Sequence, residues 1–355
     1  MGKVLIVFPG IHPFHSRIRK IAESFARKGF EVECVSAFRS PSDRMHSEFF
    51  KIHYSKGYGH RSIDWLSFIC LILTLLYRNR YDILSLNSVS VLPFVAVAQL
   101  KGKTEVIYAP HELEWHKNSL NVFSRQAAKI LELCFIHKVD RVIVVGHIIA
   151  RLYCLRYGLD NCSVCRNIPD IRSVDMNNSG INLVETLEVK ESLVGVYWGI
   201  LANGRGLERV IEYTSSMNDV GVIFVGFGNF YGSLEGRQNE GIYVSPAMEM
   251  GSLFKSLAGI DFGFCLIEPT CMSYYFSLPN KAFEYITASL PVAMSDLPEL
   301  EKLNSKYRFG EKVDDIDSFR NFLSKIRAGD FLKGIKTFNE HENWEKEFET
   351  AWIKY

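Results

Sequence analysis

The sequence predicts an α/β protein made of two doubly wound domains, each with a parallel sheet covered by helices. Short apolar runs alternate with amphipathic, helix-period segments along most of the chain, as expected for repeated strand–helix units. The alternation pauses once, over residues 166–187, and then starts again. The 355 residues fit two domains of about 150–180 residues better than one. Ligands of this fold class bind beyond the carboxyl ends of the strands, so we expect the chemistry in a cleft between the domains.

In the first half, apolar runs too short for helices predict buried strands. They lie at residues 4–8, 32–36, 83–86, 105–108 and 141–145. The segments between them have helical periodicity, at residues 16–28, 90–100 and 124–138.

Residues 166–187 are polar and contain a loose MNNSG stretch, so they are the predicted hinge. Beyond them, strands are predicted at residues 193–197, 222–225, 242–244, 260–264 and 291–294, and helices at 207–215, 249–257 and 280–288. We therefore predict domains over residues 1–170 and 171–335, followed by a C-terminal helix within 336–355.

The composition is that of a globular protein, with 47% hydrophobic and 23% charged residues. The eight cysteines are scattered, and the apolar run at 4–8 is too short for a secretory signal, so we expect reduced thiols in a cytoplasmic protein. Cys162 and Cys165 form an isolated CxxC pair. No second pair or histidine cluster completes a zinc site, so buried strand positions are favoured over metal or redox chemistry.

The net charge of +1 hides a division between the two halves. Residues 1–170 carry 23 Lys and Arg against 14 Asp and Glu, a balance of +9, and residues 171–355 carry 18 against 26, a balance of −8. A basic first half suggests an anionic partner, either a membrane surface, a phosphate-bearing acceptor or nucleic acid. Nucleic acid is the weakest of these because no recognition module is present. Incidental solvated charge is the alternative.

The longest apolar run, residues 65–77, is flanked by Arg61, Arg78 and Arg80. It is too short to span a hydrocarbon core, which needs about 20 residues. A buried core helix is the favoured interpretation, and an interfacial helix with basic ends is the second.

Two glycine turns follow predicted strands in the second half. The first runs from Gly199 to Gly206 and leads into a helix, so its amides and Arg205 are suited to bind a pyrophosphate. The second contains Gly226 and Gly228, where close backbone approach would suit a nucleobase or ribose edge. Each turn, taken alone, is equally well explained as a plain tight turn.

The segment 274–292 is more specific, because it places a helix start, a lysine and a glutamate close together. Pro279 is expected as the first helical residue. The helix start offers free amides to a phosphate beside the Lys281 ammonium, and the Glu284 carboxylate is placed to accept two hydrogen bonds from a ribose diol. A solvated helix glutamate is the alternative. The residues predicted to bind the donor here are Ser277, Leu278, Pro279, Asn280, Lys281 and Glu284.

This segment resembles the donor-binding signature of the retaining GT-B glycosyltransferases, the family-4-like group, in the variant common among bacterial surface-polysaccharide enzymes. The two glycine turns match the family's glycine turns, and His111-Glu112 resembles its His-Glu pair near the donor sugar. The segments 142–167, 243–261 and 343–345 also resemble the family. The likeness covers nearly the whole chain and is strongest over residues 193–300.

The resemblance implies a GT-B fold, two Rossmann-like domains facing across a cleft, and hexosyl transfer from a nucleotide-sugar donor to a glycan or lipid-linked acceptor. It further implies retention of configuration without a metal or other cofactor, with His111 bonding the donor sugar. Arg205 and Lys281 would stabilise the leaving diphosphate as it gains negative charge. Acceptor groups are expected in N-terminal loops, around residues 9–17 and 87–90.

The sequence departs from the family pattern at three positions. The first acidic residue of the usual Glu-x7-Glu pair is Phe276, so recognition of the sugar hydroxyls is in doubt, and Glu268 is a substitute candidate. Ile200 replaces a basic residue that often follows the first glycine, and Ser289 replaces a glycine before the last strand.

Two other functions share this fold. A sugar-nucleotide epimerase would need several carboxylates around the donor sugar, and Phe276 argues against that. A catalytically silent scaffold at the membrane would not need Arg205, Lys281 and Glu284 together. We therefore predict a glycosyltransferase of the cytoplasm or of the inner face of the plasma membrane, in peripheral contact with anionic lipid.

Overall fold

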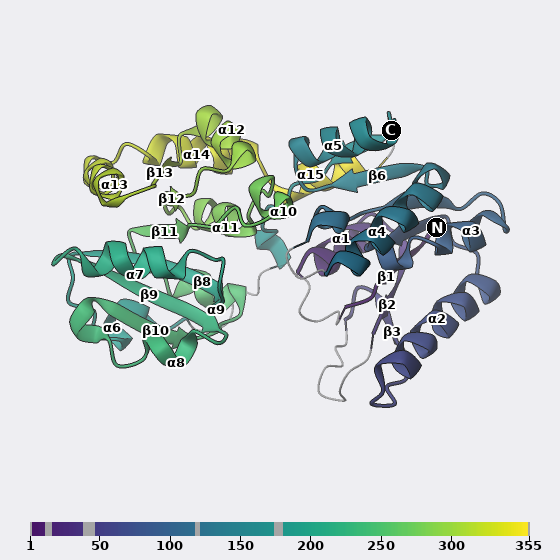
Figure 1. Cartoon of the computed structure of the whole chain (residues 1–355), viewed down its shortest axis with the longest axis horizontal. Coiled ribbons are helices and arrows are strands. Elements are labelled where there is room, and N and C mark those ends of the chain that lie inside the picture. Colours follow the sequence, from purple (N-terminus) through teal and green to yellow (C-terminus); the bar gives the residue numbers. More distant parts are fainter. Residues whose placement is uncertain (1, 11–15, 38–46, 118–120, 174–179, 354–355) are drawn as a thin grey trace. The chain divides into compact units, whose positions relative to one another are not determined.

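The computed structural model describes residues 2–10, 16–37, 47–117, 121–173 and 180–353 (Figure 1). The chain divides into two compact units. The first contains Met1–Arg166 and Glu345–Tyr355, and the second contains Asn167–Trp344. The last residues of the chain therefore return to the N-terminal unit.

The first unit is built on a seven-stranded sheet in the order β3-β2-β1-β4-β5-β6-β7, in which all neighbouring strands are parallel. The strands are β1 (Lys3–Phe8), β2 (Glu31–Ser36), β3 (Lys51–Tyr54), β4 (Ile83–Leu86), β5 (Glu105–Tyr108), β6 (Arg141–Val144) and β7 (Cys162–Val164). The central strands are buried on both faces, which is why they appear in the sequence as continuous apolar runs.

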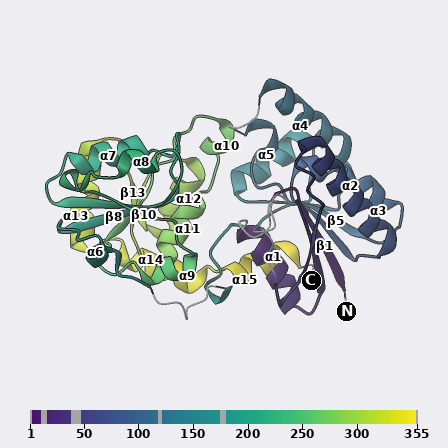
Figure 2. The ribbon, with the colours of Figure 1, turned by 90° about the horizontal axis from the view of Figure 1, so that it is seen from below.

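Helices cover both faces of this sheet. Right-handed crossovers place α1 (Ser16–Arg27) on one face, and α15 (Trp344–Trp352) packs beside it (Figure 2). The other face carries α2 (Arg61–Arg78), α3 (Phe94–Gln99), α4 (Val122–Phe135) and α5 (His147–Tyr157). Short 3-10 turns η3 (Val89–Val91), η4 (Glu114–His116) and η5 (Ile136–Lys138) lie between them.

The C-terminal helix packs on the first unit through aromatic contacts and through hydrogen bonds from an arginine. Phe348 and Trp352 lie edge-on to Phe25 of α1, with ring centroids 5.0 and 5.8 Å away. The Arg141 guanidinium donates to the carbonyls of Ala351 and Trp352 at 2.7 and 3.0 Å, which satisfies the last carbonyls of the helix. The single helix expected within 336–355 is thus replaced by two: α14, which ends at His341, and α15, which begins at Trp344.

The second unit has a six-stranded parallel sheet in the order β10-β9-β8-β11-β12-β13. Its strands are β8 (Leu193–Ile200), β9 (Val220–Phe227), β10 (Ile242–Pro246), β11 (Phe262–Cys265), β12 (Val292–Met294) and β13 (Gly310–Lys312). Its helices are α6 (Leu183–Thr186), α7 (Leu207–Ser215), α8 (Tyr231–Leu234), α9 (Met250–Lys255), α10 (Met272–Tyr275), α11 (Asn280–Thr287), α12 (Pro298–Tyr307), α13 (Ile316–Ala328) and α14 (Leu332–His341), with 3-10 turns η6 (Ile171–Ser173) and η7 (Gln238–Glu240).

Aromatic contacts join the helices on each face of the second sheet. Tyr213 of α7 stacks on Phe319 of α13 at 5.5 Å, and Phe283 of α11 lies 6.0 Å from Phe338 of α14. The strand order reverses between β8 and β11 because the chain adds β9 and β10 on one side and β11 on the other. This switch point is where doubly wound sheets bind ligands.

The predicted hinge contains some structure of its own. Within residues 166–187, η6 and α6 are formed, and residues 174–179 lie outside the described part of the chain. The helix expected at 90–100 is divided into η3 and α3, with Pro93 as the N-cap of α3. The apolar run 65–77 lies in α2, and no helix in the described ranges is long and apolar enough to cross a bilayer.

Candidate functional site

A pocket of about 330 Å³ opens at the carboxyl edge of the second sheet, beside the start of α11. Its walls come from the ends of β8 and β9, from the segment after β10, and from α11. It is lined by Trp198, Gly199, Ile200, Val225, Gly226, Phe227, Ala247, Met248, Met250, Leu253, Asn280, Lys281 and Glu284. Segments about 80 residues apart in sequence therefore meet at this edge.

The pocket has an apolar and a polar side. The apolar side includes Ile200 and Phe227, which are exposed, and the partly buried Met248. The polar side is formed by Asn280, Lys281 and Glu284 at the start of α11. Such a cavity matches a ligand with one flat apolar group and one charged group.

The Lys281 ammonium lies over an aromatic ring and is close enough to a second cation to be affected by its charge. It lies 4.7 Å from the ring centroid of Tyr197. Desolvation and then the charge of Arg205 lower the pKa of Lys281 to about 8, although part of the residue's surface remains accessible. A bound anion would oppose both effects, because it offers the ammonium an opposite charge.

Arg205 lies in the glycine turn between β8 and α7 and is partly buried. Its guanidinium carbon is 5.3 Å from the ring centroid of Tyr274, so the planar group is positioned by an aromatic face. The Glu268 N–H donates to the Gly204 carbonyl at 3.3 Å, which brings the loop after β11 against this turn. The structure therefore groups Arg205 and Lys281 as one cationic site.

The glycines of the two turns have a packing role that sequence reasoning did not assign. At Gly206 and Gly228, φ is +73° and +146°, and an added Cβ would lie 1.9 Å from the Leu266 carbonyl oxygen and 2.2 Å from that of Leu201. At Gly226 a Cβ would lie 1.9 Å from the Gly199 carbonyl oxygen. These three positions face neighbouring backbone of the same unit, so they need glycine for the fold itself.

Gly199 differs from the other three glycines. Its φ is +125°, and an added Cβ would lie 3.1 Å from the Lys281 ammonium nitrogen. A side chain here would therefore crowd the cationic end of the pocket.

The Glu284 carboxylate is fixed by an indole. Trp198 donates from its ring nitrogen to Glu284 Oε2 at 2.6 Å. Trp198 is itself held by the Tyr285 hydroxyl, which contacts its backbone N–H at 3.3 Å, and by the Tyr285 ring at 4.3 Å. The second carboxylate oxygen of the partly buried Glu284 thus has a fixed direction on the pocket wall.

The helix start differs in detail from the prediction. Pro279 is the N-cap of α11, and the helix begins one residue later, at Asn280. The Pro279 backbone is extended, with φ of −64° and ψ of 134°, so the helix does not reach further toward the N-terminus. Leu278 is buried, and the Ser277 hydroxyl already donates to the Tyr274 carbonyl at 2.7 Å. The Ala282 N–H donates to the Pro279 carbonyl at 3.1 Å, whereas the N–H groups of Asn280 and Lys281 have no acceptor within the helix.

Phe276 and Glu268 lie on the loops before α11. Phe276 is partly buried with its ring 4.9 Å from Tyr275. The Glu268 carboxylate makes no hydrogen bond or ion pair with residues of the described ranges, and the residue is partly exposed.

His111 belongs to the other unit, at the carboxyl end of β5. Its ring stacks on Phe8, the last residue of β1, with centroids 5.5 Å apart and planes at 8°. Asn87, from the expected acceptor loop, is buried and donates to Val7 O and Ser85 Oγ at 3.3 and 2.9 Å, so it braces β1 against β4. Of the other expected acceptor residues, 11–15 lie outside the described ranges.

The CxxC cysteines have little thiolate character. Burial is the first cause that raises the pKa of Cys165 to about 11 and that of Cys162 to about 12. Among the residues with described positions, no three His, Cys, Asp or Glu side chains are grouped to hold a metal ion.

Three aromatic residues that contact the charged groups of this site were missed from the sequence: Tyr197, Trp198 and Tyr274. They are ordinary strand and loop aromatics in the sequence, and their contacts with Lys281, Glu284 and Arg205 depend on the tertiary fold.

Comparisons with known proteins bear on this site and on the fold. Residues 16–170 match the family model described as Glycosyltransferase Family 4. No curated protein matches the chain at a significant level of sequence similarity.

Solved structures match over almost the whole chain. Sucrose-phosphate synthase from Thermosynechococcus elongatus has a TM-score of 0.74 at 13% identity, covering 99% of this chain and 95% of its own. Anabaena Alr3699/HepE, solved in complex with UDP and glucose, has a TM-score of 0.70 at 14% identity, covering 99% and 98%. The lipopolysaccharide outer core galactosyltransferase WaaB in its apo form has a TM-score of 0.64 at 13% identity, covering 98% of each chain.

These likenesses show the GT-B fold of two Rossmann-like domains, and the family match covers the N-terminal unit. The resemblance to GT-B glycosyltransferases that the motifs indicated is confirmed, in the fold of the whole chain and in the family match over residues 16–170.

Proposed function

We propose that this chain transfers a hexosyl group from a nucleotide-sugar donor to a glycan or lipid-linked acceptor, with retention of configuration, in bacterial surface polysaccharide biosynthesis. The observation that supports this most is that three kinds of group meet at one sheet edge. They are an apolar pocket wall, the Glu284 carboxylate fixed by Trp198, and the cations Lys281 and Arg205. A nucleoside diphosphate has a flat base, a diol and a diphosphate, which are complementary to these three kinds of group.

In this proposal the base lies against Ile200, Phe227 and Met248, and the ribose diol donates to Glu284. The diphosphate oxygens accept hydrogen bonds from the Lys281 ammonium, the Arg205 guanidinium and the first amides of α11. When the bond from the anomeric carbon to the diphosphate oxygen breaks, the electron pair stays with the diphosphate. Fixed cations at that oxygen stabilise the developing charge, and the acceptor hydroxyl forms the new bond to the anomeric carbon and passes its proton to the departing diphosphate.

The next part of the proposal concerns the groups around the donor sugar and the diphosphate. His111 is assigned to the donor sugar by resemblance, and its stacking on Phe8 supports a fixed ring orientation at the carboxyl edge of the first sheet. Cationic residues take the place of a metal at the diphosphate in this scheme. The Glu268 carboxylate, on the loop against the Arg205 turn, is a candidate for the sugar hydroxyls.

Peripheral membrane contact is the last part of the proposal, and α2 supports it. One side of α2 is buried through Phe68, Ile72 and Leu75, while Leu66, Leu73 and Tyr77 are exposed on another side. The exposed residues are spaced by seven and four, so they lie on one face of the helix.

Helix α4 covers the same face of the sheet as α2 and is also exposed at apolar positions (Figure 2). Phe123 is 87% exposed, and Ile130 and Leu133 are on the same side of the helix. Single exposed apolar residues are ordinary, but two such helical faces on the same side of the sheet, with basic flanks, fit an anionic membrane surface.

The test is calorimetry with UDP, followed by product analysis with nucleotide-sugar donors and membrane extracts as acceptors. We expect UDP binding and transfer of the sugar to a larger product. Binding without any turnover would indicate a scaffold. Release of a free sugar whose configuration at a ring carbon has changed would indicate an epimerase.

A further inference from the structure

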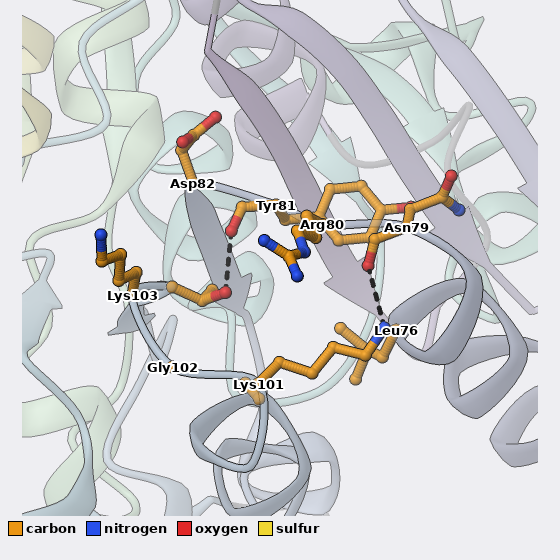
Figure 3. A pocket seen from close by; sticks show the side chains of 10 residues that line it. Leu76, Asn79, Arg80, Tyr81, Asp82, Lys101, Gly102 and Lys103 are labelled. Carbon is orange, nitrogen blue, oxygen red and sulfur yellow. Dashed lines mark hydrogen bonds between the residues drawn. The ribbon is translucent and has the colours of Figure 1, made fainter.

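A basic hollow of about 480 Å³ lies at the amino ends of β4 and β5, at the edge of the first sheet opposite His111 (Figure 3). It shares no residue with the proposed donor site. The hollow is lined by Leu76, Asn79, Arg80, Tyr81, Asp82, Ala98, Lys101, Gly102, Lys103 and Thr104.

The floor of the hollow is a tight turn with two left-handed residues in succession. Gly102 has φ of +62° and Lys103 has φ of +64°, a left-handed conformation that lysine rarely adopts. The Thr104 hydroxyl donates to the Tyr81 carbonyl at 2.8 Å and ties the turn to the segment after α2. The two segments that carry the cations are thus fixed to each other.

Three cations converge here against one carboxylate. Lys101 donates to the carbonyls of Tyr77 and Asn79, so it caps the C-terminal end of α2. Arg80 and Lys103 make no ion pair or side-chain hydrogen bond with any residue of the described ranges. In Figure 3 the Arg80 guanidinium lies between the side chains of Lys101 and Lys103. The single carboxylate, Asp82, accepts from the Lys3 backbone N–H at 2.6 Å.

Two exposed residues directly adjoin lining residues along the chain, Tyr77 after Leu76 and Leu100 before Lys101, and are here called the rim of the hollow. Tyr77 is 80% exposed with the Lys101 ammonium 5.4 Å from its ring centroid, and Leu100 is 86% exposed. Tyr77 also ends the exposed face of α2 that contains Leu66 and Leu73. A tyrosine with a polar tip beside basic residues is suited to the boundary between lipid headgroups and acyl chains.

We infer that the hollow binds the phosphate of an anionic lipid headgroup through Arg80 and Lys103, with Tyr77 and Leu100 inserted at the lipid boundary. This inference rests on the membrane contact in the proposed function and gives that contact a site and a headgroup chemistry. A free phosphate ion would use the two unpaired cations but would leave the apolar rim unexplained. The lipid source is therefore favoured.

The experiment is co-sedimentation of the full chain with vesicles of phosphatidylglycerol and phosphatidylcholine, and with phosphatidylcholine alone. The double variant Arg80→Gln, Lys103→Gln removes both unpaired cations and should weaken binding to the anionic vesicles about 30-fold, since each basic side chain contributes about fivefold. The variant Tyr77→Ser, Leu100→Ser should weaken it without changing any charge.

The matched control is Lys129→Gln, Lys138→Gln, which removes two charges from the α4 region of the same helical layer but outside the hollow. The inference requires a clearly smaller loss in this control. Equal losses in the two double variants would show diffuse attraction and overturn the site. Unchanged melting temperatures establish that the exposed substitutions leave the fold intact.

Two further readouts separate the possible sources of phosphate and the possible failures. If calorimetry shows that inorganic phosphate binds in an Arg80- and Lys103-dependent way while vesicle binding stays normal in the variants, the lipid assignment is wrong. A change of mass in sedimentation on Tyr77→Ser, Leu100→Ser would indicate a second copy on this rim and would also overturn it. Donor turnover without vesicles should be unchanged in every variant, so loss of lipid binding and failure of the proposed enzyme activity are distinguishable.

Discussion

The indole of Trp198 sets the direction of the Glu284 carboxylate before any donor is bound. If the free oxygen accepts two hydrogen bonds from a ribose diol, Glu284→Ala loses charge-assisted bonds worth roughly 1.5–3 kcal/mol each. We therefore predict that UDP binds about 100-fold more weakly, or worse, in titration calorimetry. Trp198→Phe should show a smaller loss, because the carboxylate remains but is less well oriented.

The control for this prediction is Glu301→Ala, which removes an exposed glutamate from α12 of the same unit. Its UDP affinity should equal that of the unchanged chain. Near-normal affinity in Glu284→Ala would remove the ribose assignment.

Lys281 gives the donor site a pH dependence. Because its pKa in the unliganded site is about 8, the ammonium is partly neutral in mildly alkaline solution. A diphosphate prefers the charged form, so UDP affinity should fall as pH rises through about 8, with a slope of up to tenfold per pH unit. Lys281→Arg keeps its charge throughout and should abolish this dependence, which calorimetry over a pH series measures. An equal slope in both proteins would place the titrating group elsewhere.

Cation-based stabilisation of the diphosphate also predicts the effect of chelation. If Arg205, Lys281 and the α11 amides provide the charge at the leaving group, sugar transfer should continue at its full rate in excess EDTA. The comparison is between initial rates with EDTA, with added Mg²⁺ and with added Mn²⁺. A strict requirement for either ion would contradict the scheme.

At the scale of elements, a buried glutamate joins β5, α4 and α5. Glu132 of α4 accepts from Tyr108 and Tyr153 through one oxygen at 2.7 and 2.8 Å, and from Tyr157 through the other at 2.7 Å. Desolvation outweighs these hydrogen bonds, and the nearby Glu114 adds to it, so the pKa of Glu132 rises to about 7. The folded protein therefore holds this proton over a range in which the unfolded chain releases it.

The sign of the consequence follows from proton linkage. Between the ordinary glutamate pKa of 4.5 and about 7 the folded state binds more protons, so stability falls as pH rises, by about 3 kcal/mol in total from this group. Glu132→Gln cannot titrate, so its unfolding free energy should fall less than that of the unchanged chain between about pH 4 and about pH 8. Parallel pH profiles, measured by denaturant unfolding, would show that Glu132 is already ionised in the folded state.

The elements differ in how far the sequence predicted them. Central strands such as β1 and β9 were predicted because burial on both faces demands an unbroken apolar run. The edge strands β3 and β13 have the sequences KIHY and GEK, which carry no such signal, and they were not predicted. For α2, the sequence left a core and an interfacial helix as alternatives, and the structure shows one buried and one exposed apolar side.

The candidate site was predicted less completely than the fold. The motif around Lys281 and Glu284 was predicted because its residues are consecutive and one lies at a helix start. The indole on Glu284 comes from β8, 86 residues away, and only the packing of β8 beside β11 and α11 brings the two together. Gly206, Gly226 and Gly228 were predicted as ligand contacts, and the sequence did not reveal that their Cβ directions also meet backbone of their own unit.

At the scale of the whole molecule, charge is divided between the halves of the chain. Residues 1–170 carry a balance of +9 and residues 171–355 a balance of −8. The basic half also contains the exposed apolar faces of α2 and α4. The same half of the chain thus supplies both exposed apolar side chains and excess positive charge. Reversible binding to anionic membranes needs both.

The last prediction is that the intact chain binds anionic vesicles in a strongly salt-dependent way. Each basic side chain near such a surface contributes about 1 kcal/mol, so a handful is sufficient for reversible binding. The attraction should weaken as salt rises, because the Debye length falls from about 10 Å at 0.1 M to about 3 Å at 1 M. Co-sedimentation with anionic and neutral vesicles across a salt series measures this. If anionic vesicles are not preferred even at low salt, the membrane model fails, and the exposed faces of α2 and α4 need another partner.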